Sequence, residues 1–74
     1  MNLSNNPMYK ALKAHYQAKK LKALANIEVF MKAPVGVAEH DDLVSTICTQ
    51  VEKLAHAEDV LYCLESHFED DDEE

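Results

Sequence analysis

Apolar side chains recur with helical spacing along residues 40–68. Steps of four and three residues alternate along one seam, as in a helix that packs lengthwise against another helix. The seam consists of Leu43, Ile47, Gln50, Leu54, Ala57, Leu61, Leu64 and Phe68. Further apolar side chains widen it: Val44, Cys48, Val51, Ala55 and Tyr62. The pattern predicts a helix with a broad buried stripe.

Residues 7–32 have helical spacing too, but they carry two apolar faces. One is rich in small residues, which let another helix approach closely: Ala11, Ala14, Ala18, Leu21, Leu24, Ala25 and Met31. The other is a column at seven-residue spacing joined by one leucine: Tyr9, Leu12, Tyr16, Ala23 and Phe30. One neighbouring helix cannot cover both faces.

The ends of both helices are marked by local chemistry. Asn6 is a suitable N-cap, and Pro7 at the first helical position loses no hydrogen bond. Pro34 disfavours the helical conformation at the residue before it and ends the first helix near Lys32. Acidic residues around His40 suit the start of the second helix, because the free N–H groups there are partly positive. We therefore expect helices at about 7–32 and 40–68, joined by a loop at 33–39.

These elements predict an all-α fold, an antiparallel coiled-coil-like hairpin in residues 1–68. A chain of 74 residues buries a marginal core. Because one apolar face of the first helix stays uncovered, we expect a homodimer in the form of a four-helix assembly. The predicted core is Leu21, Leu24, Ile47, Leu54, Leu61, Leu64 and Phe68. The predicted partner-binding face is Tyr9, Leu12, Tyr16 and Phe30.

Charge divides the chain into opposite halves. Residues 1–33 carry six of the seven lysines and one acid, a net +5, whereas residues 34–74 carry one lysine and thirteen acids, a net −12. Two helices lying side by side would be held by this asymmetry. An alternative is single-stranded nucleic-acid binding by lysines and an aromatic ring of the first helix. Its candidate residues are Lys10, Lys13, Tyr16 and Lys20.

The sequence ends in six acidic residues, 69–74, which predict a disordered tail. Such a tail can solubilise the chain. A further alternative is an acidic decoy that occupies a host nucleic-acid-binding protein.

The connection APVGVAEHDD holds the only glycine of the chain. Proline at the second and glycine at the fourth position of a turn favour a simple hairpin connection. The alternative is a binding loop, for which the candidate residues are Pro34, Gly36, Glu39 and His40.

Enzymatic and metal chemistry find little support. One glycine cannot build a phosphate-binding loop, and no nucleophilic triad follows from the spacing, so we expect neither an enzyme nor a cofactor.

Metal ligands could converge on one face of the second helix at 4,3,4 spacing, but without the Glu-x-x-His pairs of di-iron bundles. They are Glu52, His56, Asp59 and Cys63. We interpret them as a polar stripe.

The two cysteines, Cys48 and Cys63, lie about 22 Å apart along one helix and cannot form an intrachain disulfide. Reduced thiols suit a cytoplasmic location. No segment is apolar enough over roughly 20 residues to span a membrane.

The segments APVGVAEHDDLV and HAEDVLYCLESHF resemble a group of small proteins of T4-like bacteriophages, including those of marine cyanobacteria, that carry no assigned activity. That group has a P-V-G-[IV]-x-E-H loop followed by a helix with A-E-D-x-L and an aromatic end. The matching positions are Pro34, Val35, Gly36, Val37, Glu39, His40, Ala57, Glu58, Asp59, Leu61 and Phe68. The similarity covers about residues 18–68. It implies an origin in a phage genome and action inside a bacterial host. Together with the helical hairpin, this leads us to expect a non-enzymatic phage accessory protein that binds a host or phage protein in the cytoplasm of the host cell.

Overall fold

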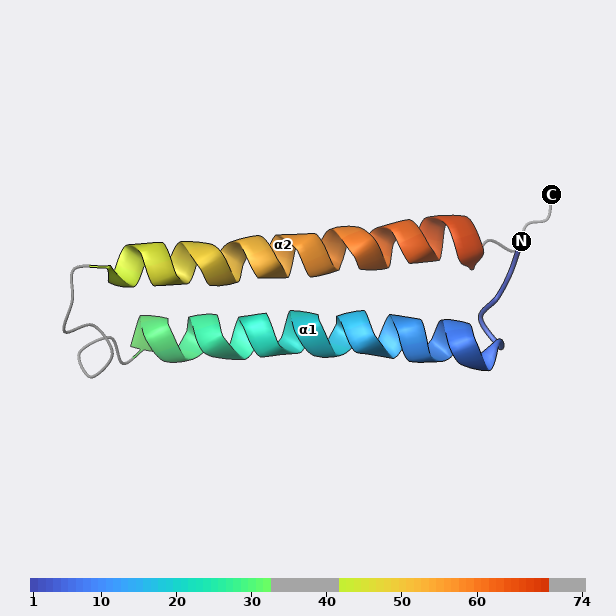
Figure 1. The fold of residues 1–74 in the computed structure, drawn as a ribbon, viewed down its shortest axis with the longest axis horizontal. Coiled ribbons are helices and arrows are strands. Elements are labelled where there is room, and N and C mark those ends of the chain that lie inside the picture. Colours follow the sequence, from blue (N-terminus) through green and yellow to red (C-terminus); the bar gives the residue numbers. More distant parts are fainter. Residues whose placement is uncertain (33–41, 70–74) are drawn as a thin grey trace.

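The computed structural model describes residues 1–32 and 42–69. They form two α-helices, α1 (Pro7–Lys32) and α2 (Leu43–Phe68), of 26 residues each. The helices lie side by side and antiparallel, so that the start of α1 and the end of α2 lie at the same end of the pair (Figure 1). The predicted all-α hairpin is confirmed. The predicted second-helix start near His40 falls outside the described residues, and α2 begins at Leu43 after Asp42.

Asn6 caps α1 as its side chain predicts. Its Oδ1 accepts a hydrogen bond from the backbone N–H of Tyr9 at 3.0 Å, and its carbonyl accepts from the N–H of Lys10 at 2.9 Å. Two N–H groups of the first turn are thereby satisfied. At the start of α2 the carbonyl of Asp42 accepts from the N–H of Thr46 at 3.0 Å, but the Asp42 side chain makes no cap bond. The first helix is the more firmly started of the two.

The core is a thin line along the contact between the helices. Its members are Tyr9 and Ala23 from α1, and Ala57, Leu61 and Leu64 from α2. The two alanines are the least exposed, at 2% for Ala23 and 1% for Ala57. Small side chains let helix backbones approach closely. The close approach of α1 and α2 in the middle of the hairpin therefore depends on small side chains at Ala23 and Ala57.

The predicted packing face of α1 is wrong. Leu21 is 65% exposed and Leu24 is 41% exposed, and the alanines at 11, 14, 18 and 25 are exposed as well. The Tyr9/Tyr16/Ala23/Phe30 column faces α2 instead, with Tyr16 and Phe30 half-buried. Aromatic rings bury more apolar surface than alanines. This column also has a close-approach residue at its centre, so it offers a better contact than the alanine face.

Side-chain pairs between the helices fix the antiparallel register. Tyr9 meets Phe68 edge-on at 6.2 Å between ring centroids near the chain ends. Farther along, the Asn26 Nδ2 donates to the Gln50 Oε1 at 3.2 Å. A half-buried polar pair of this kind is satisfied in one register and broken in others.

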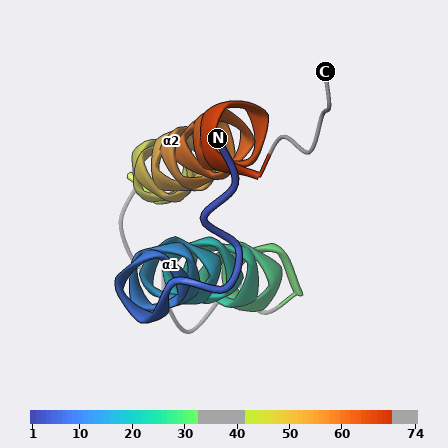
Figure 2. The same cartoon turned by 90° about the vertical axis from the view of Figure 1, so that its right-hand side faces the viewer.

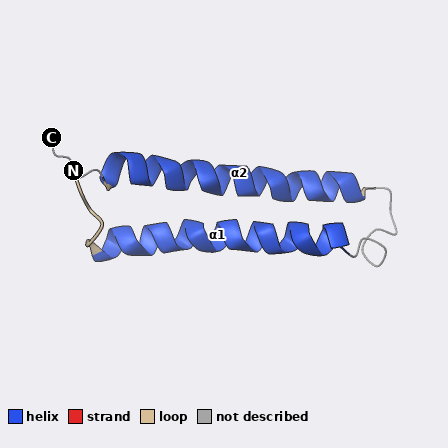
Figure 3. Ribbon diagram, turned by 180° about the vertical axis from the view of Figure 1, so that it is seen from behind, coloured by secondary structure: helices blue, strands red, loops and turns tan. Residues whose placement is uncertain are grey.

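The segment before α1 closes the open end of the hairpin. It crosses from α1 to the end of α2, as the end-on view shows (Figure 2), and the same crossing is visible from behind (Figure 3). The N–H of Leu3 donates to the carbonyl of Phe68 at 2.6 Å, and Asn2 forms an isolated antiparallel bridge with Glu69. The first residues thus satisfy a free carbonyl at the end of α2.

Candidate interaction surfaces

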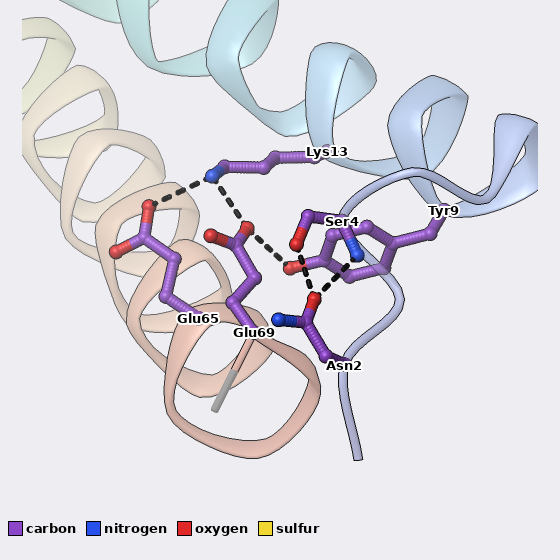
Figure 4. A network of polar contacts seen from close by, with 6 residues as sticks. All are labelled: Asn2, Ser4, Tyr9, Lys13, Glu65 and Glu69. Carbon is purple, nitrogen blue, oxygen red and sulfur yellow. Dashed lines mark hydrogen bonds and ion pairs between the residues drawn. The ribbon is translucent and has the colours of Figure 1, made fainter. Parts of the chain in front are cut away.

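A polar network, here the chain-end network, joins the two helices beside the N-terminal segment (Figure 4). The Tyr9 hydroxyl donates to the Glu69 Oε2 at 2.7 Å, and the Lys13 Nζ lies 2.5 Å from the same oxygen. Lys13 also pairs with Glu65 at 3.4 Å. Glu69 was predicted to begin a disordered tail. That assignment is wrong for Glu69, because two donors on α1 hold its carboxylate.

The network shifts the ionisation of its members. The hydrogen bond from Lys13, followed by that from Tyr9, lowers the pKa of Glu69 below its ordinary 4.5. The hydrogen bond to Glu69 raises the pKa of Lys13. Burial, followed by the hydrogen bond to Glu69, raises the pKa of Tyr9 from 10.0 to about 12. At neutral pH Tyr9 is therefore a neutral phenol, Lys13 an ammonium and Glu69 a carboxylate.

One side of the hairpin carries exposed apolar side chains from both helices. Leu21 of α1 and Tyr62 of α2 line the same groove, together with the buried Leu61. By helical periodicity, neighbouring apolar side chains continue this surface along each helix. We call it the apolar face and define it as Leu21, Leu24, Met31, Val44, Val51 and Tyr62. Their exposed fractions range from 41% for Leu24 to 72% for Val44.

The other side of the hairpin carries a groove of about 470 Å³. Its charged and amide lining residues come from both helices, above the buried alanines Ala23 and Ala57. We call it the basic groove and define it as Lys19, Lys22, Asn26, Gln50, Lys53 and His56. Among residues 1–32 and 42–69, Glu52 is the one carboxylate that lines it. The two grooves share no lining residue, because they flank opposite sides of the helix contact.

Aromatic rings extend the basic groove toward the chain ends. Tyr16 meets His56 across the helices at 6.4 Å between ring centroids, and His15 meets Tyr16 at 5.1 Å. The Lys19 ammonium lies 5.9 Å from the centre of the Tyr16 ring, within the range of a cation–π contact. Cationic and aromatic groups are therefore adjacent here.

The predicted partner-binding residues do not form a free face. Tyr9 is 5% exposed inside the hairpin, and Tyr16 and Phe30 are half-buried against α2. Leu12 is 44% exposed. The physical reason is the exchange of faces on α1: the column expected to bind a partner packs within the chain, and the expected core leucines lie outside.

The predicted nucleic-acid set is divided by ion pairs. Lys13 belongs to the chain-end network, and Lys20 pairs with Glu58 at 3.8 Å. Lys10 is exposed, while Tyr16 lies beside the basic groove. The structure does not bring these four residues together as one cationic surface.

The remaining candidate residues are those of the loop, the acidic tail, the possible metal ligands and the cysteines. Pro34, Gly36, Glu39 and His40 of the candidate loop, and tail residues 70–74, lie outside the described residues. Within residues 1–32 and 42–69, no group of three or more His, Cys, Asp or Glu side chains is arranged to hold a metal ion. Cys48 and Cys63 are both free and exposed.

Comparison with known proteins identifies no relative. No family model matches the chain, and no curated protein or solved structure matches it significantly. Neither described helix is both long and apolar enough to cross a lipid bilayer.

Both surfaces were missed by sequence reasoning. The apolar face was divided between a supposed core and the edges of a seam. The basic groove combines α1 lysines with Lys53, the only lysine of the acidic half, and only the antiparallel register brings them together.

Proposed function

We propose that this protein is a non-enzymatic interaction module that self-associates through the apolar face into a four-helix assembly. In the setting implied by the phage resemblance, the assembly binds another protein in the cytoplasm of an infected bacterium. The observation that carries the proposal is the exposure of six large apolar side chains on one side of the hairpin, whereas the described residues include five buried core residues.

The size of the apolar face supports a dimer. Full burial of a Val, Leu or Met side chain removes roughly 100 Å² of apolar surface from water. At the observed exposures, the six side chains offer roughly 350 Å² on one copy and roughly 700 Å² across two copies. Apolar atoms supply roughly 60% of an interface, so the whole contact would bury on the order of 1,200 Å². Specific interfaces begin at about this area.

The arrangement of charge supports pairing of two copies through the middle and loop-proximal part of the hairpin. Near the chain ends, the same side of the hairpin carries charged groups, with Lys20 paired to Glu58 and Lys13 paired to Glu65. A two-fold contact centred on the apolar face leaves these pairs at the polar rim, where charged groups remain hydrated. It also joins four helices around the valines and leucines that one hairpin leaves exposed.

Sedimentation equilibrium of the full chain over a wide concentration range tests the proposal. We expect a mass of twice the 8.4 kDa chain at high concentration. The double variant Leu21→Ser and Tyr62→Ser changes one residue on each helix of the apolar face. It should sediment as a monomer at concentrations where the original protein is dimeric. Helicity should be retained, because both side chains are exposed in the single chain.

A matched control replaces two exposed apolar residues that do not belong to the apolar face, Met8→Ser and Val29→Ser, at 81% and 54% exposure. This variant should dimerise like the original protein. A monomeric mass at every concentration would contradict the proposal. Equal loss of association in both double variants would show that general hydrophobicity, rather than the apolar face, drives association.

A further inference from the structure

We propose that the basic groove binds single-stranded nucleic acid, with Lys19, Lys22 and Lys53 contacting the phosphates. This inference goes beyond self-association and concerns the opposite side of the hairpin. It also differs from the lysine set suggested by α1 alone, because it includes a lysine of α2 and excludes the two lysines held by interhelical ion pairs.

The lysines differ in whether they form ion pairs within the hairpin. Lys13 and Lys20 pair with carboxylates of α2 and its end, and Lys32 pairs with Glu28 on its own helix. In residues 1–32 and 42–69, the other four lysines have no carboxylate at ion-pairing distance. Three of those four line the basic groove. Among the described residues, most lysines without an ion pair thus lie in the basic groove.

Acidic groups that face the neighbouring helix are gathered elsewhere. Glu58 and Glu65 line the groove that contains Leu21 and Tyr62, on the opposite side of the hairpin, and Glu69 lies in the chain-end network. A net charge of −7 therefore does not describe the basic groove, where three lysines outnumber one glutamate. A cationic groove can attract phosphate even though the whole protein is negatively charged. Salt largely screens the acidic groups that lie more than about 10 Å from the groove.

The neighbouring groups favour a single strand over a duplex. Tyr16, His15 and His56 place aromatic rings beside the lysines. Unpaired bases can stack on such rings, whereas paired bases are enclosed in the duplex. The Asn26 and Gln50 amides add donors and acceptors along the groove floor. A volume of about 470 Å³ is in the range that encloses a nucleotide-sized ligand.

Fluorescence anisotropy with a labelled single-stranded oligothymidylate tests the proposal on the full chain. Three phosphate contacts predict a slope of about −2 for the logarithm of the binding constant against the logarithm of salt concentration. The triple variant Lys19→Gln, Lys22→Gln and Lys53→Gln should bind at least about tenfold more weakly than the original protein. The charge-matched variant Lys10→Gln, Lys20→Gln and Lys32→Gln should keep its affinity within about twofold. Circular dichroism of both variants verifies the fold.

Several results would overturn the proposal. These are no anisotropy change at low salt, equal loss in the two triple variants, or equal binding of duplex and single strand. Equally effective competition by polyglutamate would assign the groove to acidic protein segments instead. The Leu21→Ser and Tyr62→Ser variant should still bind the oligonucleotide, so failure of self-association and failure of the groove can be distinguished.

Discussion

The contact between Ala23 and α2 decides which face of α1 is the packing face, and it can be tested by overpacking. Ala23 is 2% exposed in the middle of the helix contact, whereas Ala18, five residues earlier, is exposed. Leucine at either site has a helix propensity close to that of alanine. Ala23→Leu and Ala18→Leu therefore differ almost only in whether the new side chain meets α2.

The expected effect follows from the closeness of the helices. Ala23→Leu inserts three carbons where both helices present nearly inaccessible alanines, so the helices must separate or the side chain must leave its favoured rotamer. Overpacking of this kind costs about 1–3 kcal/mol. Ala18→Leu should change the free energy of unfolding by less than about 0.5 kcal/mol. For a domain of this size, with a total stability of roughly 4–11 kcal/mol, the first change is large.

Urea denaturation followed by circular dichroism measures both variants at one protein concentration, because association couples stability to concentration. With a slope of about 1 kcal/mol per molar urea, the midpoint of Ala23→Leu should fall by about 1–3 M. That of Ala18→Leu should stay almost unchanged. If Ala18→Leu were the more destabilising variant, α2 would pack on the alanine face and the reasoning would be refuted.

Two further predictions concern the chain-end region. Asn6→Ala removes the cap bond to the Tyr9 N–H and should lower the free energy of unfolding by about 1 kcal/mol. Asn5→Ala, at an exposed neighbouring position, is the control, and equal losses would argue against capping. Glu69 has a lowered pKa, so its stabilisation is present above about pH 4.5 and is lost as pH falls through its folded-state pKa. Tyr9 has a raised pKa, so its stabilisation is complete below pH 10 and is lost as pH rises toward about 12. Urea denaturation midpoints measured across pH test both groups. The midpoint of Glu69→Gln should approach that of the original protein in acid, and the midpoint of Tyr9→Phe should fall less than that of the original protein in alkali. Differences in midpoint that do not change with pH would contradict the network.

The hairpin itself could be predicted because its signals are local. Asn6 and Pro7 mark the start of α1 through the chemistry of one helical turn. The alternating seam identifies the buried side of α2, where Ala57, Leu61 and Leu64 are indeed buried. The charge asymmetry anticipated ion pairs between the helices, of which Lys20 with Glu58 is one.

The packing face of α1 could not be predicted, because both of its columns satisfy the same periodicity. Leu21 and Leu24 have the composition of a core, yet the choice depends on what α2 presents opposite each position. Phe68 meets Tyr9, and Gln50 meets Asn26, only in the observed register. Periodicity describes one helix at a time, whereas these pairs belong to two.

Glu69 shows the same limit at the end of the chain. Six consecutive acids predict a solvated tail, and composition alone gives no reason to separate the first from the rest. Its position is set by Tyr9 and Lys13, which lie 60 and 56 residues away in the sequence. Both candidate surfaces likewise depend on which residues the antiparallel register brings together.

Alkylation of the two native cysteines tests the central claim, association through the apolar face, most directly. Both thiols are exposed in the single chain, but Cys48 lies within one helical turn of Val44 and Val51, whereas Cys63 lies one turn from Asp59 and His67. We expect the alkylation rate of Cys48 to fall as the concentration of the original protein rises, and to stay constant in the monomeric Leu21→Ser and Tyr62→Ser variant. The alkylation rate of Cys63 should not change with concentration in either protein. Unchanged reactivity of Cys48 in a protein that sediments as a dimer would contradict the assignment of the interface to the apolar face.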